Sequence, residues 1–148
     1  MLDLLNSRRL RLVLTALLRI AADTKPVSGK LLAEKLHCPR RYLEPDLQSL
    51  VQQGILESRR GASGGYLMAR NPQRVNLLDI LQCLVPERES EALEDACRLQ
   101  QSIVHENLLK AQHNCEQVLA DIQLSKWLEQ AEAQGLLHAV STTPDFCI

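Results

Sequence analysis

Apolar residues at spacings of three and four mark the first long segment of the chain. This period places them on one face of a helix, so the pattern predicts a helix from about Asn6 or Ser7 to Ala22. The turn before Pro26 ends it, because a residue that precedes proline is disfavoured in the helical region. The apolar face consists of Leu10, Val13, Leu14, Leu17, Leu18 and Ala21.

Two shorter amphipathic segments follow, separated by a turn at residues 37–39. Ser28 is a favourable N-cap for the first segment, which is predicted to end at Leu36. The second runs to about Gln53, and Gly54 closes it at the position where a left-handed residue commonly ends a helix. The residues expected to face the core are Leu31, Leu32, Leu36, Leu43, Leu47, Leu50 and Val51.

A short hairpin is predicted directly after these helices. Residues 55–56 and 65–68 are strand candidates, and the tip between them carries arginines and glycines. Glycines at the tip allow positive φ angles and a close approach of the backbone to another surface. Two helices joined by a tight turn also occur as an ordinary helical hairpin, but the basic hairpin after them favours a winged helix-turn-helix.

The second half of the sequence is predicted to be helical as well. Asn76 caps a helix over 77–85, Pro86 follows it, and a helix-prone acidic region extends from Ser90 to about Ala133. Within this region apolar residues alternate in steps of four and three, the heptad pattern of a helix–helix interface. This seam favours a dimer interface over packing on the chain's own domain. Its members are Val104, Leu108, Ala111, Cys115, Val118 and Ile122.

These elements define the predicted fold class, which is mainly α with a small β-hairpin wing. The length of 148 residues suits one domain with a helical extension. We expect a winged helix-turn-helix DNA-binding head over 1–85, long helices for dimerisation and possible sensing over 86–140, and a flexible tail over 141–148.

The charge of the chain is divided unequally between its halves. The net charge is −1, but residues 1–74 carry 13 Lys and Arg against 6 Asp and Glu, a net +7. Residues 75–148 carry 4 against 12, a net −8. A basic half neutralises phosphates and steers association, whereas DNA repels the acidic half, which must face elsewhere. Ordinary solvated surface on both halves is the alternative interpretation.

Several classes of protein are disfavoured by what the sequence lacks. The apolar stretch Leu10–Ala22 is interrupted by Arg11 and Arg19 and is too short to cross a bilayer, so no membrane partner is expected. Five cysteines without a tight framework indicate reduced thiols and a cytoplasmic protein. The sequence contains no metalloprotease, Cys-x-x-Cys or serine-hydrolase motif, so we predict no enzyme and no catalytic residue.

Seven short motifs of the first half stand at spacings that fit a single family. They are Pro26-Val27-Ser28, Leu32-Ala33-Glu34, Tyr42-Leu43-Glu44, Gly54-Ile55-Leu56, Arg60-Gly61, Gly64-Gly65-Tyr66 and Ala69-Arg70. As a set they resemble the Rrf-two (Rrf2) family of winged-helix regulators, which includes IscR, NsrR and CymR. The resemblance implies a cytoplasmic homodimeric transcription factor whose long helices pair two heads. Two basic heads related by a two-fold axis suit a pseudo-palindromic operator.

The start of the second short helix is predicted to enter the major groove of DNA. Arg40 and Arg41 are expected there, either paired with guanine O6 and N7 or bound to phosphate. Tyr42 is expected to bond a phosphate or to pack in the core. Glu44 resembles the family's acidic residue in this helix, where a carboxylate accepts from cytosine N4 or repels a wrong site. Proline resists the helix interior, so Pro45 predicts a first turn that is open or starts late.

The hairpin tip is predicted to follow the minor groove, where narrow A·T tracts attract arginine. Ser28 and Lys30 are predicted phosphate ligands, since helix N-termini attract anions. A nucleotide-binding P-loop is disfavoured, because the glycines of the tip lack the Gly-Lys-Ser/Thr ending. The expected DNA-binding residues of the tip are Arg59, Arg60, Gly61, Ser63, Gly64 and Gly65.

Cysteines and histidines of the second half are the candidate residues of a sensor. Several family members hold an iron–sulfur cluster through three closely spaced cysteines before the long helix, but only Cys97 stands in that region here. No family-type cluster or other cofactor is therefore expected. A rearranged site of Cys97 with His105 or His113 is one alternative. A thiol switch between Cys97 and Cys115 is another, and ordinary buried or helical cysteines are a third.

The sequence thus predicts a homodimeric, sequence-specific DNA-binding transcription regulator, of the repressor kind, with double-stranded DNA as its partner. Residues 39–49 and the wing at 59–66 are expected to read the operator. A winged helix that works as a protein-interaction adaptor, with the acidic helices as its working face, is the alternative from a different class. A redox-sensing regulator is a variant of the first prediction.

Overall fold

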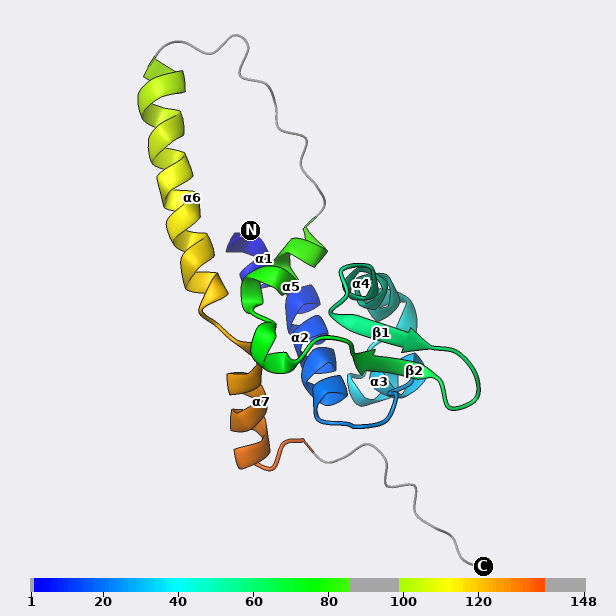
Figure 1. The fold of residues 1–148 in the computed structure, drawn as a ribbon. Helices are drawn as coiled ribbons and strands as arrows, with labels where there is room; N and C mark the ends of the chain where they lie inside the picture. Colours follow the sequence, from blue (N-terminus) through cyan, green and yellow to red (C-terminus); the bar gives the residue numbers. More distant parts are fainter. Residues whose placement is uncertain (1, 86–98, 138–148) are drawn as a thin grey trace, which may run out of the picture.

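The computed structural model describes residues 2–85 and 99–137. A head of short helices carries a two-stranded wing on one side, and a long helix projects from the other side (Figure 1). This mainly α fold with a small β-hairpin confirms the predicted fold class. The elements are α1 (Leu2–Leu5), α2 (Arg8–Ala21), α3 (Gly29–Lys35), α4 (Arg40–Gln52), β1 (Leu56–Arg59), β2 (Gly65–Met68), η1 (Pro72–Arg74), α5 (Leu77–Leu84), η2 (Gln100–Val104), α6 (His105–Ala120) and α7 (Leu124–Ala133).

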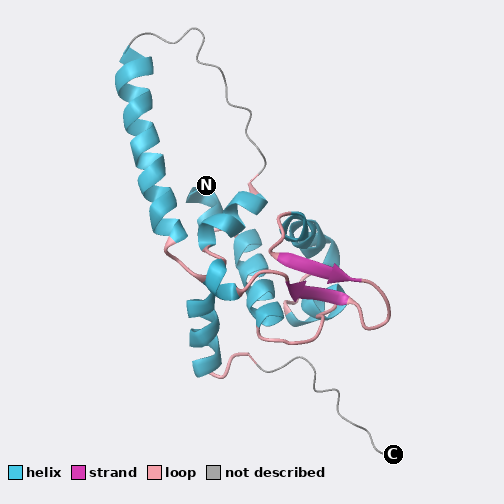
Figure 2. Ribbon diagram, in the orientation of Figure 1, coloured by secondary structure: helices cyan, strands magenta, loops and turns pink. Residues whose placement is uncertain are grey.

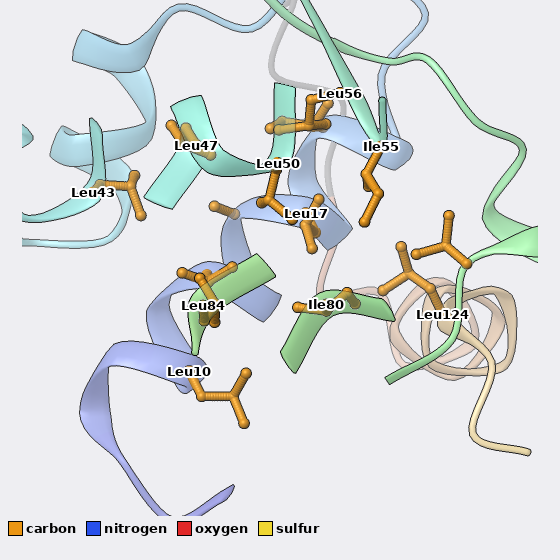
Figure 3. Close-up of a cluster of buried hydrophobic side chains, with 14 of the residues drawn as sticks. Leu10, Leu17, Leu43, Leu47, Leu50, Ile55, Leu56, Ile80, Leu84 and Leu124 are labelled. Atoms are coloured by element: carbon orange, nitrogen blue, oxygen red, sulfur yellow. The ribbon is translucent and has the colours of Figure 1, made fainter. Parts of the chain in front are cut away.

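One face of α2 forms the centre of the core. Of the predicted face, Leu14, Leu18 and Ala21 lie at the edge and are only partly buried. Buried side chains of α4, β1, α5 and α7 surround the rest, and Figure 3 shows how they meet. The buried positions of α2 are Leu10, Val13, Ala16, Leu17 and Ile20.

The predicted helix-turn-helix is present as α3 and α4. The hydroxyl oxygen of Ser28 accepts a hydrogen bond from the backbone N–H of Leu31 at 3.2 Å, which caps α3 as predicted. His37 adopts a positive φ of 50° in the turn between the helices. Gly54, at φ 69°, follows α4 in the left-handed conformation that a helix C-terminus favours.

The predicted late start of α4 is wrong. The helix begins at Arg40 and continues through Pro45. Pro45 has no N–H to donate to the carbonyl of Arg41. Because Arg41 is exposed, water can solvate that carbonyl, so the missing bond falls where the helix tolerates it.

The wing is an antiparallel hairpin held to the start of α3. β1 pairs with β2 so that Arg59 lies opposite Gly65, next to the loop of the hairpin (Figure 2). Val27, just before α3, exchanges two backbone hydrogen bonds of 2.9 Å with Tyr66. A Cβ atom on Gly65 would lie 2.4 Å from the carbonyl oxygen of Val27. Glycine at this position therefore permits the close approach of the wing to the head.

The chain returns to the head after α6. The N–H of Leu77 donates to the carbonyl of Ile122 at 2.8 Å, and the N–H of Leu124 donates to the carbonyl of Val75 at 2.9 Å. Leu124 is buried and points into the core (Figure 3). Side chains from beyond residue 85 therefore complete the core of the head, while the domain division predicted there stays a prediction.

In its described part, the helix-prone region predicted up to about Ala133 consists of two helices. α6 ends at Ala120, and α7 begins at Leu124. Ile122 lies in the break between them and packs against the core. The break follows from the backbone pairing of this segment with the start of α5. Ile122, the last predicted member of the heptad seam, therefore does not continue the exposed face of α6.

The rest of the predicted seam is exposed to solvent in the single chain. Leu108 and Val118 are 64% and 63% exposed. Large apolar side chains exposed along one helix are typical of interaction surfaces. η2, which is a π-helical turn, and α6 expose Ile103, Val104, Leu108, Leu109, Ala111, Cys115 and Val118.

Two further observations complete the fold. The hydrophobic pattern did not predict the short helix α1, which contacts α2. Within residues 2–85 and 99–137, no helix combines the length and the apolar character needed to cross a membrane. The predicted tail at 141–148 lies outside the described residues.

The return of α7 generates a prediction about stability. Replacing the buried Leu124 by alanine should lower the free energy of unfolding by about 2–5 kcal/mol, since it removes buried apolar contacts and leaves a cavity. Leu136 is 63% exposed, so Leu136→Ala should change it by less than about 0.5 kcal/mol. Urea denaturation of both variants at one protein concentration measures the difference. Equal and small effects would mean that α7 does not belong to the core.

Candidate nucleic-acid interface

The start of α3, the first turns of α4 and the base of the wing form one continuous surface. A Cβ atom on Gly29 would lie 3.4 Å from Nε of Arg40 and 3.6 Å from Cε2 of the Tyr66 ring. The side-chain amide of Gln48 donates to the hydroxyl of Tyr66 at 3.1 Å. The wing is therefore attached to α4 as well as to the segment before α3.

The predicted residues at the start of α4 lie on the outside of this surface. Nη2 of Arg40 bonds to Oε1 of Glu44 at 2.9 Å, one helical turn away. The guanidinium of Arg41 lies 5.3 Å from the centre of the Tyr42 ring, within cation–π range. Tyr42 is 61% exposed, so its predicted alternative place in the core is wrong.

The tip of the wing is a tight turn between two arginines and two glycines. The N–H of Gly64 donates to the carbonyl of Gly61 at 3.0 Å, and Gly61 adopts a φ of 106°. A Cβ atom on Gly64 would lie 2.4 Å from the carbonyl oxygen of Arg59. Nε of Arg59 bonds to Glu57 at 2.9 Å. Arg60 is exposed and forms no ion pair with any described residue.

Ser28 and Lys30, the phosphate ligands predicted at the start of α3, differ in how freely their side chains can bind an anion. The oxygen of Ser28 is occupied by its capping bond to Leu31, although its hydroxyl hydrogen can still be donated. Lys30 is exposed on the first turn of α3. Ser63 is exposed at the tip of the wing. The surface thus offers positive charge from three places: α3, α4 and the wing.

An ion pair that the sequence did not predict connects α2 to α4. Nε of Arg9 donates to both carboxylate oxygens of Asp46, at 3.0 and 3.1 Å, and Nη2 also contacts Oδ1. Asp46 is 3% exposed. Its hydrogen bonds raise the pKa of Arg9 above the ordinary value. The position of Asp46 next to Leu47, on the inward face of α4, was the available signal, because an unpaired charge is rarely buried.

A comparison of the whole sequence with known protein families identifies the family of the chain. The sequence model of the Rrf2 family, described as an iron-dependent transcriptional regulator, matches residues 6–130. The chain belongs to the Rrf2 family. The matched range contains α2 to α5, the wing and α6, so the predicted resemblance is confirmed beyond the head.

Individual relatives of this Rrf2 protein agree with the family. BadM of Rhodopseudomonas palustris, an HTH-type transcriptional regulator by name, is 42% identical over 69 residues, which are 46% of this chain and 44% of BadM. The transcriptional repressor CcpN of Bacillus subtilis is 31% identical over 87 residues, 54% of this chain and 41% of CcpN. The chain thus spans less than half the length of these curated relatives. The family and both relatives are transcriptional regulators, not enzymes.

A solved structure extends the similarity over most of the chain. T. potens IscR superimposes with a TM-score of 0.63 at 29% sequence identity. The match covers 86% of this chain and 89% of the IscR chain. The Rrf2 fold therefore includes the second half of the chain, where α6 and α7 lie.

The described residues do not supply an iron site of the kind that the family description implies. Iron–sulfur and iron sites need several cysteine, histidine or carboxylate ligands in one place. Among residues 2–85 and 99–137 no three such side chains come together. Cys38 lies in the turn before α4, Cys83 on α5 and Cys115 on α6.

The predicted sensor residues are separated in the same way. Cys97 lies outside the described residues. His105 begins α6, and Cys115 is exposed on the same helix. His113 shares a 2.9 Å hydrogen bond between its Nε2 and Gln117. The part of the chain that the structure describes brings none of these residues together as a site.

The pair of Arg9 and Asp46 generates a prediction about stability. Asp46→Asn should lower the free energy of unfolding by about 1–3 kcal/mol, because it weakens the hydrogen bonds of a buried group. Arg9 is half exposed, so solvent screens its charge, and a double-mutant cycle with Arg9→Gln should show a coupling near 1 kcal/mol. Denaturant titration of the two single variants and the double variant measures this coupling. Strictly additive effects would contradict a direct interaction.

The environment of Cys83 generates a prediction about pH. Burial, and secondarily the carboxylate of Asp79, raise the pKa of the Cys83 thiol. The neutral thiol is the form that the fold favours, so its stabilising contribution is present below the unfolded pKa and is lost as pH rises through the folded pKa. Alkylation of Cys83 by iodoacetamide, followed by mass spectrometry, should begin at higher pH in the folded chain than in denaturant. If the alkylation of Cys83 depended on pH in the same way in the folded and the denatured chain, the fold would not raise the pKa of this thiol.

Proposed function

We propose that this Rrf2 protein is a homodimeric, sequence-specific DNA-binding regulator that represses transcription. One observation carries the proposal: α3, the first turns of α4 and the wing form a single basic surface. Gln48 and Val27 attach the wing to α4 and to α3 through Tyr66. A helix and a hairpin held in this way are able to contact adjacent grooves of a duplex together.

The start of α4 is proposed to lie in the major groove. Glu44 holds Arg40 along the helix, which positions its guanidinium while neutralising part of its charge. Arg41 forms no ion pair with any described residue. We therefore assign guanine contact, which needs a free bidentate guanidinium, to Arg41 ahead of Arg40. Tyr42, exposed beside it, supplies a hydroxyl for a phosphate.

The tip of the wing is proposed to lie along the minor groove. Arg60 is exposed there and forms no ion pair with a described residue, whereas Arg59 forms an ion pair with Glu57. Gly61, Ser63 and Gly64 carry little or no side chain, so the tip is narrow enough to approach the backbone of DNA. Narrow minor grooves attract arginine through their negative potential.

The exposed apolar face of α6 is proposed to pair with the α6 of a second copy. Leu108 and Val118 are more than half exposed in the single chain, and burying both on a partner removes apolar surface from water. The helix α6 itself lies on the side of the molecule away from the wing (Figure 1). A two-fold axis through it would leave both basic surfaces free for two half-sites.

The repressor role and the absence of a family-type cluster are also proposals. The name of CcpN as a repressor supports the first. The dispersed positions of the described cysteines support the second. With reduced thiols and a DNA partner, we propose that the protein works in the cytoplasm.

DNA binding is tested by a titration with the duplex upstream of the protein's own gene. Affinity should fall steeply as salt rises, because bound phosphates release counterions. Arg60→Gln should weaken DNA binding by about tenfold. It should also reduce the slope of log affinity against log salt concentration by about one, the contribution of one phosphate contact. Arg41→Gln should cost about 1–3 kcal/mol and relax the preference for that duplex over a scrambled one. Fluorescence anisotropy at several salt concentrations measures all three effects.

Lys110→Gln is the matched control for the loss of one charge. Lys110 pairs with Glu106 on α6, away from the proposed surface, so this variant should bind DNA like the parent protein. If Lys110→Gln and Arg60→Gln lost the same DNA affinity, the effect would be one of overall charge and would not indicate a defined binding surface. No salt-dependent binding to any duplex would overturn the proposal and favour a protein-interaction adaptor.

A further inference from the structure

A groove of about 620 Å³ lies between the first half of α2 and the start of α4. Arg8 and Leu12 of α2 line one side, and Arg41, Tyr42 and Pro45 of α4 line the other. Pro39, at the turn before α4, also lines it. The volume is within the range of about 300–1,000 Å³ that is typical of small-molecule sites. Two of its lining residues, Arg41 and Tyr42, also belong to the surface proposed for DNA.

The cations of this groove are not all equivalent. Asp46 neutralises Arg9, with which it forms the bidentate ion pair described above. Neither Arg8 nor Arg41 forms an ion pair with a residue in the described ranges. The groove therefore has two guanidinium groups on opposite walls that are available to an anion.

Apart from the paired Arg9 and Asp46, the other side chains that line the groove are apolar or aromatic. Leu12, Pro39 and Pro45 offer hydrocarbon, and Tyr42 offers an aromatic ring whose centre also lies 5.3 Å from the Arg41 guanidinium. A phosphate or another small inorganic anion leaves these surfaces in contact with water, so it gains nothing from them. An uncharged apolar molecule leaves the guanidinium groups without a partner. A ligand that satisfies both features has an anionic head and an apolar body.

We propose that this groove binds a small organic monoanion, a carboxylate attached to an apolar body. The carboxylate lies between Arg8 and Arg41, and the body covers Leu12 and the two prolines. Arginine and carboxylate form paired, charge-assisted hydrogen bonds.

Binding in this groove has a consequence that rests on the proposed function. Arg41 and Tyr42 belong both to the groove and to the surface proposed for DNA. A carboxylate held by Arg41 occupies the guanidinium that guanine needs, so ligand and DNA compete for it. The organic anion thereby weakens operator binding, which is the effect of an inducer on a repressor.

The test titrates the full chain, without DNA, with octanoate, octan-1-ol and acetate, followed by chemical-shift changes in its amide spectrum. Octanoate has both features, octan-1-ol has only the chain, and acetate has only the charge. Octanoate should shift signals of residues 8–12 and 38–46 and bind at least about tenfold more tightly than either comparison compound. Equal binding of acetate, equal binding of octan-1-ol, or no binding of octanoate overturns the proposal.

Two variants locate the site. Arg8→Gln should weaken octanoate binding by about tenfold, because it removes one of the two paired groups. Arg11→Gln is the matched control, since Arg11 lies on the same helix but bonds to Asn6 and does not line the groove. Unchanged binding in Arg8→Gln, or an equal loss in Arg11→Gln, overturns the assignment.

A second titration adds DNA and separates the two proposals. Octanoate should raise the protein concentration at which half of the DNA is bound by the parent protein. The Arg8→Gln variant should need a higher concentration of octanoate for the same effect. Because the direct titration contains no DNA, octanoate binding is measured even if the chain binds no duplex. Octanoate binding without any effect on bound DNA would contradict the competition.

Discussion

The other elements of the head are held in place by packing against a single buried face of α2. Leu17 and Ile20 on this face have no exposed surface, and α2 contacts α4, β2 and α7. Burying one leucine-sized side chain contributes about 1.5–3 kcal/mol, so a displaced element loses several such contributions. The same face therefore sets the position of α4, of the wing and of the returning chain. The proposed DNA surface has its geometry because these elements share one support.

Local signals predicted the parts of the fold that depend on a few neighbouring residues. Ser28 caps α3, Gly54 ends α4, and the basic hairpin follows them as predicted. At the two helix ends a side chain or a φ angle acts on the backbone within four residues, and the strands of the hairpin are joined by a short turn, so these interactions lie within short stretches of sequence. The placement of the predicted DNA contacts on one surface follows from these elements.

Features that depend on distant residues could not be predicted in this way. The break of the long helix at Ile122 is set by its pairing with the start of α5, more than forty residues earlier in the chain. The partner of Asp46 is Arg9 on a different helix, and a charge on an apolar face does not reveal which cation meets it. The late start predicted from Pro45 fails because the cost of a proline in a helix depends on whether the freed carbonyl reaches water. All three are properties of the packed chain.

The proposed assembly joins two copies of this Rrf2 protein through α6 and places two basic heads on one duplex. The most direct measurement is the mass of the complex with the duplex upstream of its own gene, by sedimentation, together with the cleavage footprint on that duplex. Two chains per duplex and two protected half-sites about one helical turn apart are expected. The variant Leu108→Glu, on the exposed face of α6, should leave single folded chains that bind DNA weakly. One chain per duplex at full affinity, or a dimer that persists in Leu108→Glu, would contradict this assembly.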